Sequence, residues 1–555
     1  MRMRVLFGPN GRCATRHDRR LAASALAVRL LAGAVALLGS QAATAQVCTE
    51  STVEEGLQYL RRLSLDLRGR FPDVAEMESV VTNAGVIDPS IIRGIVRSED
   101  AVEALRQHHR NLLWTNVTDL RLSNQEWQLG LDRRTGAGDI YSMNGGRARR
   151  YRGGDQYGAC LDEPARFGAA GEILTTPDAN DPTQQREGWV LVRPYWNPST
   201  EIKVCAFDAQ TNLTGMSARR TVDCRIDSSA TQCGCGPNLS WCQSQPDRTA
   251  AKITAAMGEQ LLRFMDKVVR EGRPYTEVLT ARDIEVNGPL SHYLRFQTQD
   301  ALNFLFATPD HDFAVPELAF TEDQTWVSAM REATHAGVLT MPGYLLKFQS
   351  NRGRANRFYN AFLCQSFKAP EGGLAAADDE CNSEPDLTKR CGCKYCHVTV
   401  EPAAAYWGRW SEAGFAPMDE ATYPKVRTDC ADPQNARNPL CRRFYLTSPG
   451  HPDEEAYKGY LMPYVFATPQ REANIAQGPR GIADAAIANG SFASCATRQL
   501  YERLVAREAV ETDQAALDAL SASFVASSYD VRALIESIVT RPEYVEAGRF
   551  TGGAQ

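Results

Sequence analysis

The sequence predicts a mainly α, multi-domain protein with a cysteine-rich, irregular insertion that contains short strands. Three observations support this. Apolar residues recur at helical spacing in the N-terminal and C-terminal thirds of the chain. Residues 120–248 are instead dense in glycine, proline, aspartate and cysteine. The roughly 510 residues that follow an N-terminal leader are too many for one hydrophobic core, so we expect several units.

The leader, residues 1–45, has the pattern of a signal peptide. Arginines precede an apolar run at 30–38, and Ala43-Thr44-Ala45 resembles a cleavage site. The alternative is a membrane anchor, but the run is about nine residues long and a bilayer requires roughly 20. Cys48 lies near the new terminus without a lipobox before it. We therefore expect an exported chain, in the periplasm or at the cell surface, with no transmembrane segment after cleavage.

Charge restricts the partners of the mature chain. Removal of the leader takes seven arginines and one aspartate from 61 basic and 67 acidic residues, which leaves a net charge near −12. Phosphate binding requires the opposite sign, so nucleic acid is not an expected partner. An acidic surface instead favours a basic patch on a protein partner.

The N-terminal unit, residues 46–119, is expected to be helical. Ser51 and Glu54 form a capping box before leucines at turn spacing. Asp73 and Asp88 mark two further helix starts, the second directly before a proline. His108 and His109 lie on the apolar stripe of this unit, where a structural role is expected.

The insertion, residues 120–248, holds six cysteines among short strand-like runs such as 188–192. Cysteines this numerous indicate an oxidising compartment and disulfide bonds. Sequence does not fix the connectivity, but close neighbours are the natural partners. The expected pairs are Cys224 with Cys242, Cys233 with Cys235 or a neighbour, and, beyond the insertion, Cys430 with Cys441.

Helical periodicity returns in a middle domain, residues 249–369, and continues in a C-terminal domain, residues 471–555. An apolar stripe at 253–268 and a second run at 298–306 predict helices in the middle domain. The clearest terminal helix is expected to begin after Asp530 and to stop at Pro542.

Between these domains, residues 370–470 contain Cys393-Lys394-Tyr395-Cys396-His397, which matches the C-x-x-C-H pattern of covalent haem c attachment. The two intervening residues set the thiols at the separation of the two haem vinyl groups, and the adjacent histidine becomes the proximal iron ligand. We therefore expect one haem c, bound by Cys393 and Cys396 and ligated by His397.

Two alternatives use the same residues. Cys391, Cys393, Cys396 and His397 form a legitimate Cys₃His zinc set, although all four ligands would come from seven consecutive residues. The cysteines could also form ordinary disulfides. Under the haem interpretation, Cys391 is expected to bridge Cys381 or another nearby thiol.

The distal iron ligand is less constrained. Met462, followed by proline, lies 65 residues after His397, a separation similar to that in many small c-type cytochromes. Methionine would raise the reduction potential relative to histidine. His335 is the chief rival, with Met341 and Met418 behind it, and an open sixth position is the third possibility.

After the motif, Glu401-Pro402 is expected to start a helix that carries an aromatic stripe and ends at Gly414. Such a stripe usually belongs to a core, and here a haem edge could be part of that core. The stripe consists of Ala403, Tyr406, Trp407 and Trp410.

Four stretches carry a family resemblance: residues 62–70, residues 273–279 with 286–288, residues 335–345 with Cys364 and the C-x-x-C-H motif, and residues 490–507 with the terminal helix. They resemble the large exported cytochrome c proteins of planctomycetes and myxobacteria, which are built from domains of unknown function. The resemblance implies a mostly helical, multi-domain exported haem protein. It implies no established reaction, and the insertion lies outside it.

Electron transfer with a redox partner protein is the leading functional expectation. The alternatives are a haem-dependent oxidoreductase or peroxidase with an open sixth position, and a surface binding protein in which the haem is structural. The sequence contains no G-x-S-x-G motif, Walker loop or H-E-x-x-H motif, and it assigns no catalytic residue or oligomeric state.

Overall fold

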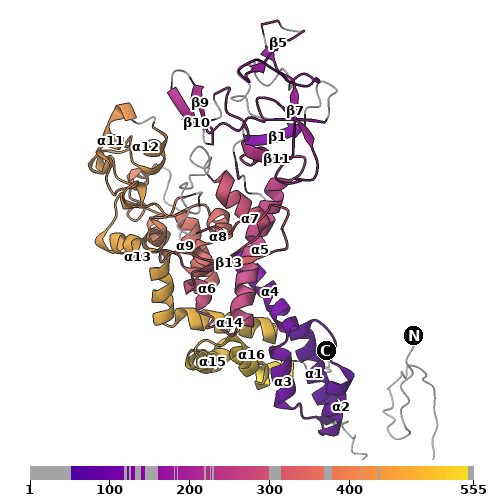
Figure 1. Cartoon of the computed structure of the whole chain (residues 1–555). Coiled ribbons are helices and arrows are strands. Elements are labelled where there is room, and N and C mark those ends of the chain that lie inside the picture. Colours follow the sequence, from indigo (N-terminus) through magenta and orange to yellow (C-terminus); the bar gives the residue numbers. More distant parts are fainter. Residues whose placement is uncertain are drawn as a thin grey trace, which may run out of the picture.

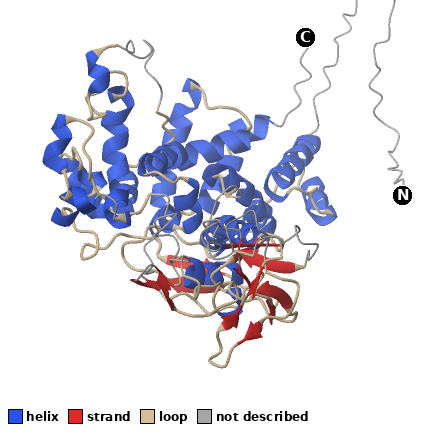
Figure 2. Ribbon diagram, turned by 90° about the horizontal axis from the view of Figure 1, so that it is seen from above, coloured by secondary structure: helices blue, strands red, loops and turns tan. Residues whose placement is uncertain are grey.

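The computed structural model describes residues 52–547, except 118–119, 121, 124–126, 132–138, 144–159, 180–181, 184, 218–219, 226, 228–229, 299–313, 368–377, 413, 415 and 436–437. The leader, Cys48, Ser51 of the expected capping box and most of the run 298–306 lie outside these residues. The described chain is mainly helical, with short strands gathered on one side of the helices (Figure 2). The predicted fold class is therefore confirmed.

Two of the N-terminal helices begin at the capping residues that the sequence predicts. The side chain of Asp73 belongs to a capping box with Glu76, and Asp88 accepts a hydrogen bond from the backbone of Ser90 at 2.7 Å. Leu60 and Leu63 are fully buried. The helices are α1 (Thr52–Arg68), α2 (Val74–Thr82), α3 (Pro89–Val96) and α4 (Glu99–Leu113).

The insertion forms a five-stranded mixed sheet of order β11-β1-β2-β8-β7, at the top of Figure 1. The strand expected near 188–192 is present as β7, antiparallel to β8, and β2 pairs with β8 in parallel. The sheet strands are β1 (Gln128–Leu131), β2 (Ile140–Met143), β7 (Trp189–Val192), β8 (Ile202–Cys205) and β11 (Gln243–Ser244). Three small hairpins surround it: β3 (Arg166–Phe167) with β4 (Ile173–Leu174), β5 (Thr176–Pro177) with β6 (Gln185–Arg186), and β9 (Thr214–Ser217) with β10 (Arg220–Asp223).

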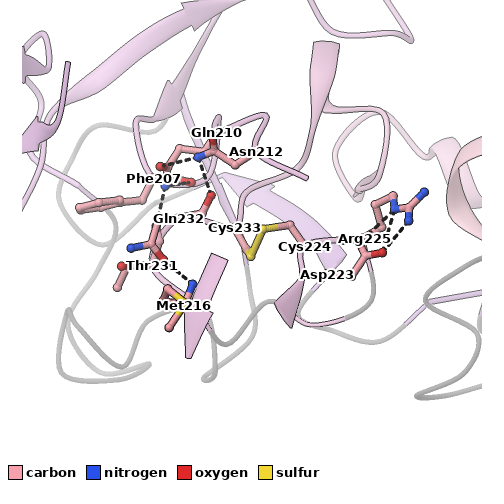
Figure 3. Close-up of a disulfide and its surroundings, with 10 residues drawn as sticks. All are labelled: Phe207, Gln210, Asn212, Met216, Asp223, Cys224, Arg225, Thr231, Gln232 and Cys233. Carbon is pink, nitrogen blue, oxygen red and sulfur yellow. Dashed lines mark hydrogen bonds and ion pairs between the residues drawn. A yellow bond between two sulfur atoms is a disulfide. The ribbon is translucent and has the colours of Figure 1, made fainter. Parts of the chain in front are cut away.

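All six cysteines of the insertion pair with one another, but two expected pairs are wrong. Cys224 bonds to Cys233, and Cys235 bonds to Cys242 (Figure 3 shows the first). Cys224 directly follows β10, and this hairpin brings it against Cys233. A turn closed by the Trp241 amide, which donates to the Cys235 carbonyl at 2.9 Å, brings Cys242 beside Cys235. The third bond joins Cys160 to Cys205.

The middle of the molecule is built on α5 (Thr249–Arg270), whose predicted apolar stripe is fully buried, for example at Met257 and Phe264. A two-stranded sheet and short helices pack around it. They are α6 (Glu277–Thr280), β12 (Asp283–Val286), α7 (Gly288–His292), η4 (Tyr293–Gln297), β13 (Val327–Met330), η6 (Gly337–Thr340), α8 (Pro342–Lys347) and α9 (Asn351–Phe362).

The segment after α9 leads into the C-x-x-C-H region and is mostly loops and short turns of helix. It contains η7 (Glu380–Ser383), α10 (Lys394–Ala404), η8 (Ala405–Trp407), α11 (Thr428–Ala431), η9 (Pro433–Asn435), α12 (Pro439–Phe444), η10 (Pro452–Tyr457) and η11 (Met462–Tyr464). A small core of its own lies under α11 and α12, around the disulfide Cys430–Cys441, which confirms that expected pair.

The C-terminal helices pack back on the N-terminal ones, so indigo and yellow elements meet in Figure 1. Tyr59 of α1 donates to the Val539 carbonyl at 2.8 Å, and Arg62 donates to the carbonyls of Leu504 and Tyr544. The helices are α13 (Pro469–Ala488), α14 (Ser491–Val505), α15 (Gln514–Ala526), α16 (Val531–Val539) and α17 (Pro542–Ala547), with the turn η12 (Glu511–Asp513).

Asp530 caps α16 as expected, accepting hydrogen bonds from two backbone amides. The helix ends at Val539, before Pro542 as expected, and Pro542 begins α17, a position that suits proline because its missing N–H is not needed there. None of the helices in the described part of the chain is long and apolar enough to cross a membrane.

Candidate functional site

The cysteines divide into two groups. Of the 14 that the structure describes, 12 form six disulfide bonds. Within the described residues, only Cys393 and Cys396, the two cysteines of the C-x-x-C-H motif, are not in a disulfide bond. Cys391, two residues before the motif, pairs with Cys381 as expected. The fold therefore removes the neighbouring thiols and leaves this one pair available for covalent chemistry.

The motif lies at the beginning of α10. Cys393 is the N-cap residue, and the His397 amide donates to the Cys393 carbonyl at 3.0 Å, which closes the first turn. The helix therefore begins at Lys394, seven residues before the expected start at Glu401. Pro402 lies inside it, where its ring removes only one helical hydrogen bond. The expected end at Gly414 is also wrong, because α10 ends at Ala404 and η8 at Trp407.

His397 is anchored by a carboxylate one turn along the same helix. Its Nδ1 lies 2.6 Å from Oε1 of Glu401. The Glu401 side chain is 8% exposed, and Arg352 Nε donates to the same oxygen at 2.6 Å. Burial opposes ionisation of Glu401, but the hydrogen bond and charge of Arg352, with His397 and Arg471, hold its pKa below the ordinary value. Because the ionised carboxylate only accepts hydrogen bonds, the tautomer that this contact favours carries its proton on Nδ1 and offers the Nε2 lone pair to a metal.

A cavity of about 800 Å³ begins at the same helix face. Glu401, Ala404 and Ala405 form one wall, and they continue the row of Cys393 and His397 at helical spacing. The volume falls in the range of small-molecule and cofactor pockets. The other walls come from residues 349–352, 385–387, 442–444, 461–463 and 465–466, together with Trp410, Glu412, Met418, Glu454 and Arg471.

The structure separates the candidate distal ligands. Met462, at the start of η11, lines the cavity and is 49% exposed although its side chain is apolar. Met418 also lines the cavity but is buried. His335 and Met341 are buried and are not among the described residues that line it.

His335 lies behind the cavity wall. Its Nδ1 is 3.2 Å from both Arg331 Nη1 and Thr340 Oγ1, and its ring meets Trp410 edge to face at 5.1 Å. Trp410, from the predicted aromatic stripe, is itself a cavity residue. His109 has the structural role that was expected, since it is fully buried with Nε2 3.0 Å from the Tyr275 hydroxyl.

Arginines line one part of the cavity. Arg442 and Arg443 of α12 are neighbours, and burial together with the charge of Arg442 lowers the pKa of Arg443 to about 10. Arg471 donates to the Phe466 carbonyl at 3.0 Å, and its buried Nε has no hydrogen-bond partner within the described part of the chain. This arrangement suits an occupant with carboxylate groups.

A zinc site is not assembled from the motif, because Cys391 is held in a disulfide. Among the described residues, three other groups lie at metal-ligand distances, namely Cys160 with Glu187 and Cys205, Asp379 with Cys381 and Cys391, and Asp429 with Cys430 and Cys441. Each of them contains both sulfurs of one disulfide. Since the thiolate is the form of cysteine that binds metal, these groups offer no cysteine ligand while oxidised.

Sequence reasoning identified the thiols and the imidazole but missed the groups around them. Glu401 could have been found from its spacing of four residues after His397, which places both on one helix face. Arg352 and Arg471 lie 49 residues before and 70 residues after Glu401, and no sequence signal connects them to it. No protein-family model, curated protein or solved structure matches the chain.

Proposed function

We propose that the chain is an exported mono-haem c-type cytochrome that transfers electrons, with haem c bound by Cys393 and Cys396 and its iron ligated by His397. One observation carries the proposal. The two cysteines of the C-x-x-C-H motif are the only described cysteines outside disulfides, and the helix that begins with them, α10, contributes Glu401, Ala404 and Ala405 to the wall of a large cavity.

The residues present fit this cofactor. The two thiols supply the covalent attachment, and the Glu401 hydrogen bond leaves Nε2 of His397 as the ligating nitrogen. Trp410 and Phe444 offer apolar surface, while Arg442 and Arg443 suit the propionate carboxylates. When bound, haem c supplies a one-electron couple whose potential depends on the axial ligands and on burial.

Met462 is the proposed distal ligand. Its thioether belongs to a half-exposed side chain on the cavity wall, whereas His335 is bonded to Arg331 and Thr340 behind Trp410. A methionine ligand would raise the potential, which suits a protein that accepts electrons. The six disulfides support export, because they persist in oxidising compartments. The redox partner is proposed to present a basic patch.

The test is expression in a host that attaches haem c, followed by mass spectrometry and visible spectra with and without carbon monoxide. We expect one covalent haem and a low-spin spectrum that the gas does not change. Rapid binding of carbon monoxide would instead favour an oxidoreductase or peroxidase with an open sixth position. Colourless protein that holds zinc would overturn the proposal.

Paired cysteine variants make this test specific. Cys393→Ser with Cys396→Ser removes both attachment thiols and should abolish covalent haem. Cys430→Ser with Cys441→Ser also removes two sulfurs from the same region, but it breaks a disulfide under α11 and α12 and should leave haem attached. Equal loss of haem in both variants would contradict the assignment of the thiols.

A further inference from the structure

The imidazole of His397 is bonded to a buried anion. The distance of 2.6 Å between Nδ1 and Glu401 Oε1 is short for a nitrogen-to-oxygen hydrogen bond, as charge-assisted bonds are. Both residues lie on α10, four positions apart, so the helix itself fixes the pair. The ring therefore has one preferred orientation and one preferred tautomer before any ligand binds to Nε2.

Glu401 is kept as an anion by two cations on other elements. Arg352 of α9 donates to Oε1, the oxygen that also faces His397. Arg471 of α13 lies 3.6 Å from Oε2. All three residues of this triad line the cavity. A buried carboxylate without such partners would become protonated. The two arginines therefore keep the Glu401 carboxylate ionised.

We propose that Glu401 is a positioning residue for His397, which holds the imidazole by an anionic hydrogen bond and lowers the reduction potential of the bound iron. The inference rests on the proposed haem function. It adds a residue that helps to set which redox partners can exchange electrons with the iron. A carboxylate bonded to the outer nitrogen makes a metal-bound histidine more basic. A more basic ligand stabilises ferric iron more than ferrous iron, so the ferric form is favoured.

This effect opposes that of a methionine ligand, which raises the potential. Arg352 weakens the effect of Glu401, because its guanidinium donates a hydrogen bond to the same carboxylate oxygen that accepts from the imidazole. Two residues beside His397 therefore act on the reduction potential of the iron. Glu401 lowers the potential, and Arg352 limits that lowering. The balance decides which donors can reduce the iron.

The test uses variants that change charge and keep shape. Glu401→Gln retains an oxygen that accepts from Nδ1 but removes the charge. Asp386→Asn is the matched control, because Asp386 is another buried carboxylate of the same cavity, and its carboxylate bonds to Thr388. Arg352→Gln removes the moderating cation and leaves Arg471, 3.6 Å from Oε2, to keep Glu401 ionised. Each variant is first checked by mass for covalent haem and then titrated potentiometrically.

We expect Glu401→Gln to shift the equilibrium toward ferrous iron about tenfold, which is about 59 mV upward for a one-electron couple. The iron–imidazole stretching frequency should fall in the same variant. Asp386→Asn should shift the equilibrium less than about threefold, which is under about 30 mV. Arg352→Gln should instead lower the potential. This opposite shift tests the same inference if Glu401→Gln does not fold.

The outcomes separate the possible failures. Wild-type protein without haem overturns the proposed function and this inference together. Haem-loaded Glu401→Gln whose potential matches that of Asp386→Asn overturns the inference alone. A lower reduction potential in Glu401→Gln would also overturn the inference. If Glu401 had only a structural role, its loss would loosen the site and admit water, and water around the iron stabilises the ferric form.

Discussion

His397 and Glu401 lie four residues apart on α10, with 2.6 Å between Nδ1 and Oε1. The pair joins the C-x-x-C-H motif to the cavity, because Glu401 is both the partner of the imidazole and a cavity residue.

Met462→Ala should open the sixth coordination position of the haem-loaded protein. Reduced protein should then bind carbon monoxide rapidly, and unfolding free energy should change by only about 0.5 kcal/mol because the side chain is half exposed. Met418→Ala is the matched control, since Met418 lines the same cavity but is buried. It should cost about 2–5 kcal/mol and leave the spectrum low-spin. A changed spectrum in His335→Ala alone would identify the rival ligand.

Acid should destabilise the fold through its buried histidines. Burial lowers the pKa of His292 to about 3 and that of His109 well below the ordinary value. Both have higher pKa values when unfolded, about 6.5, so the unfolded state binds more protons as the pH falls. Their contribution is complete above pH 6.5 and is lost toward pH 3, at up to about 1.4 kcal/mol per pH unit for each group. Urea unfolding between pH 7 and pH 4 measures this.

The variant His292→Gln serves as the comparison for that titration. Glutamine can still donate to the Ser240 carbonyl, which His292 Nε2 contacts at 3.0 Å, but it does not titrate. Its unfolding free energy should therefore depend less steeply on pH than that of the wild type. An identical slope would show that His292 is not the group responsible.

Arg354→Leu should destabilise the molecule strongly. Arg354 is fully buried, and its guanidinium donates to the carbonyls of Ser411 and Gly414 at 2.8 and 2.9 Å. Leucine would remove these guanidinium hydrogen bonds from buried carbonyls, at a cost of about 3 kcal/mol. Arg498→Leu, which removes an exposed pair with Glu502, should cost at most about 0.5 kcal/mol. Denaturant unfolding compares the two, and similar losses would contradict the role of Arg354.

The disulfide Cys364–Cys495 should stabilise the fold more than Cys235–Cys242. The first closes a loop of 131 residues between the end of α9 and α14, and the second closes a loop of 7. Chain entropy predicts losses of about 5 and about 2 kcal/mol when each pair is replaced by alanines. Urea unfolding of the two double variants tests the difference. The reverse ranking would mean that local packing outweighs the entropy of the unfolded chain.

Local signals in the sequence were the dependable ones. Asp88 and Asp530 cap helices as expected because capping involves only the next two or three residues. The buried stripe of α5 followed from periodicity alone. The pairing of Cys224 could not be predicted in this way, since it depends on how hairpin β9–β10 turns.

The same distinction between local and long-range signals applies to the candidate site. The C-x-x-C-H motif could be recognised directly in the sequence, and the structure adds that its two cysteines lie outside the disulfide bonds of the described residues. The start of α10 was misplaced because Glu401-Pro402 has the form of a helix start, while the turn from Cys393 to His397 was already helical. Arg352 reaches Glu401 only through the packing of α9 against α10, which no local pattern encodes.

The contacts of α1 with the far end of the chain set an order for biosynthesis. Tyr59 and Arg62 are synthesised early, yet their carbonyl partners at Leu504, Val539 and Tyr544 are synthesised more than 400 residues later. During this interval α1 can pack on α2, α3 and α4, but these three side-chain hydrogen bonds are not yet made. The N-terminal helices are therefore expected to reach their final stability only after the last helices of the chain have been synthesised.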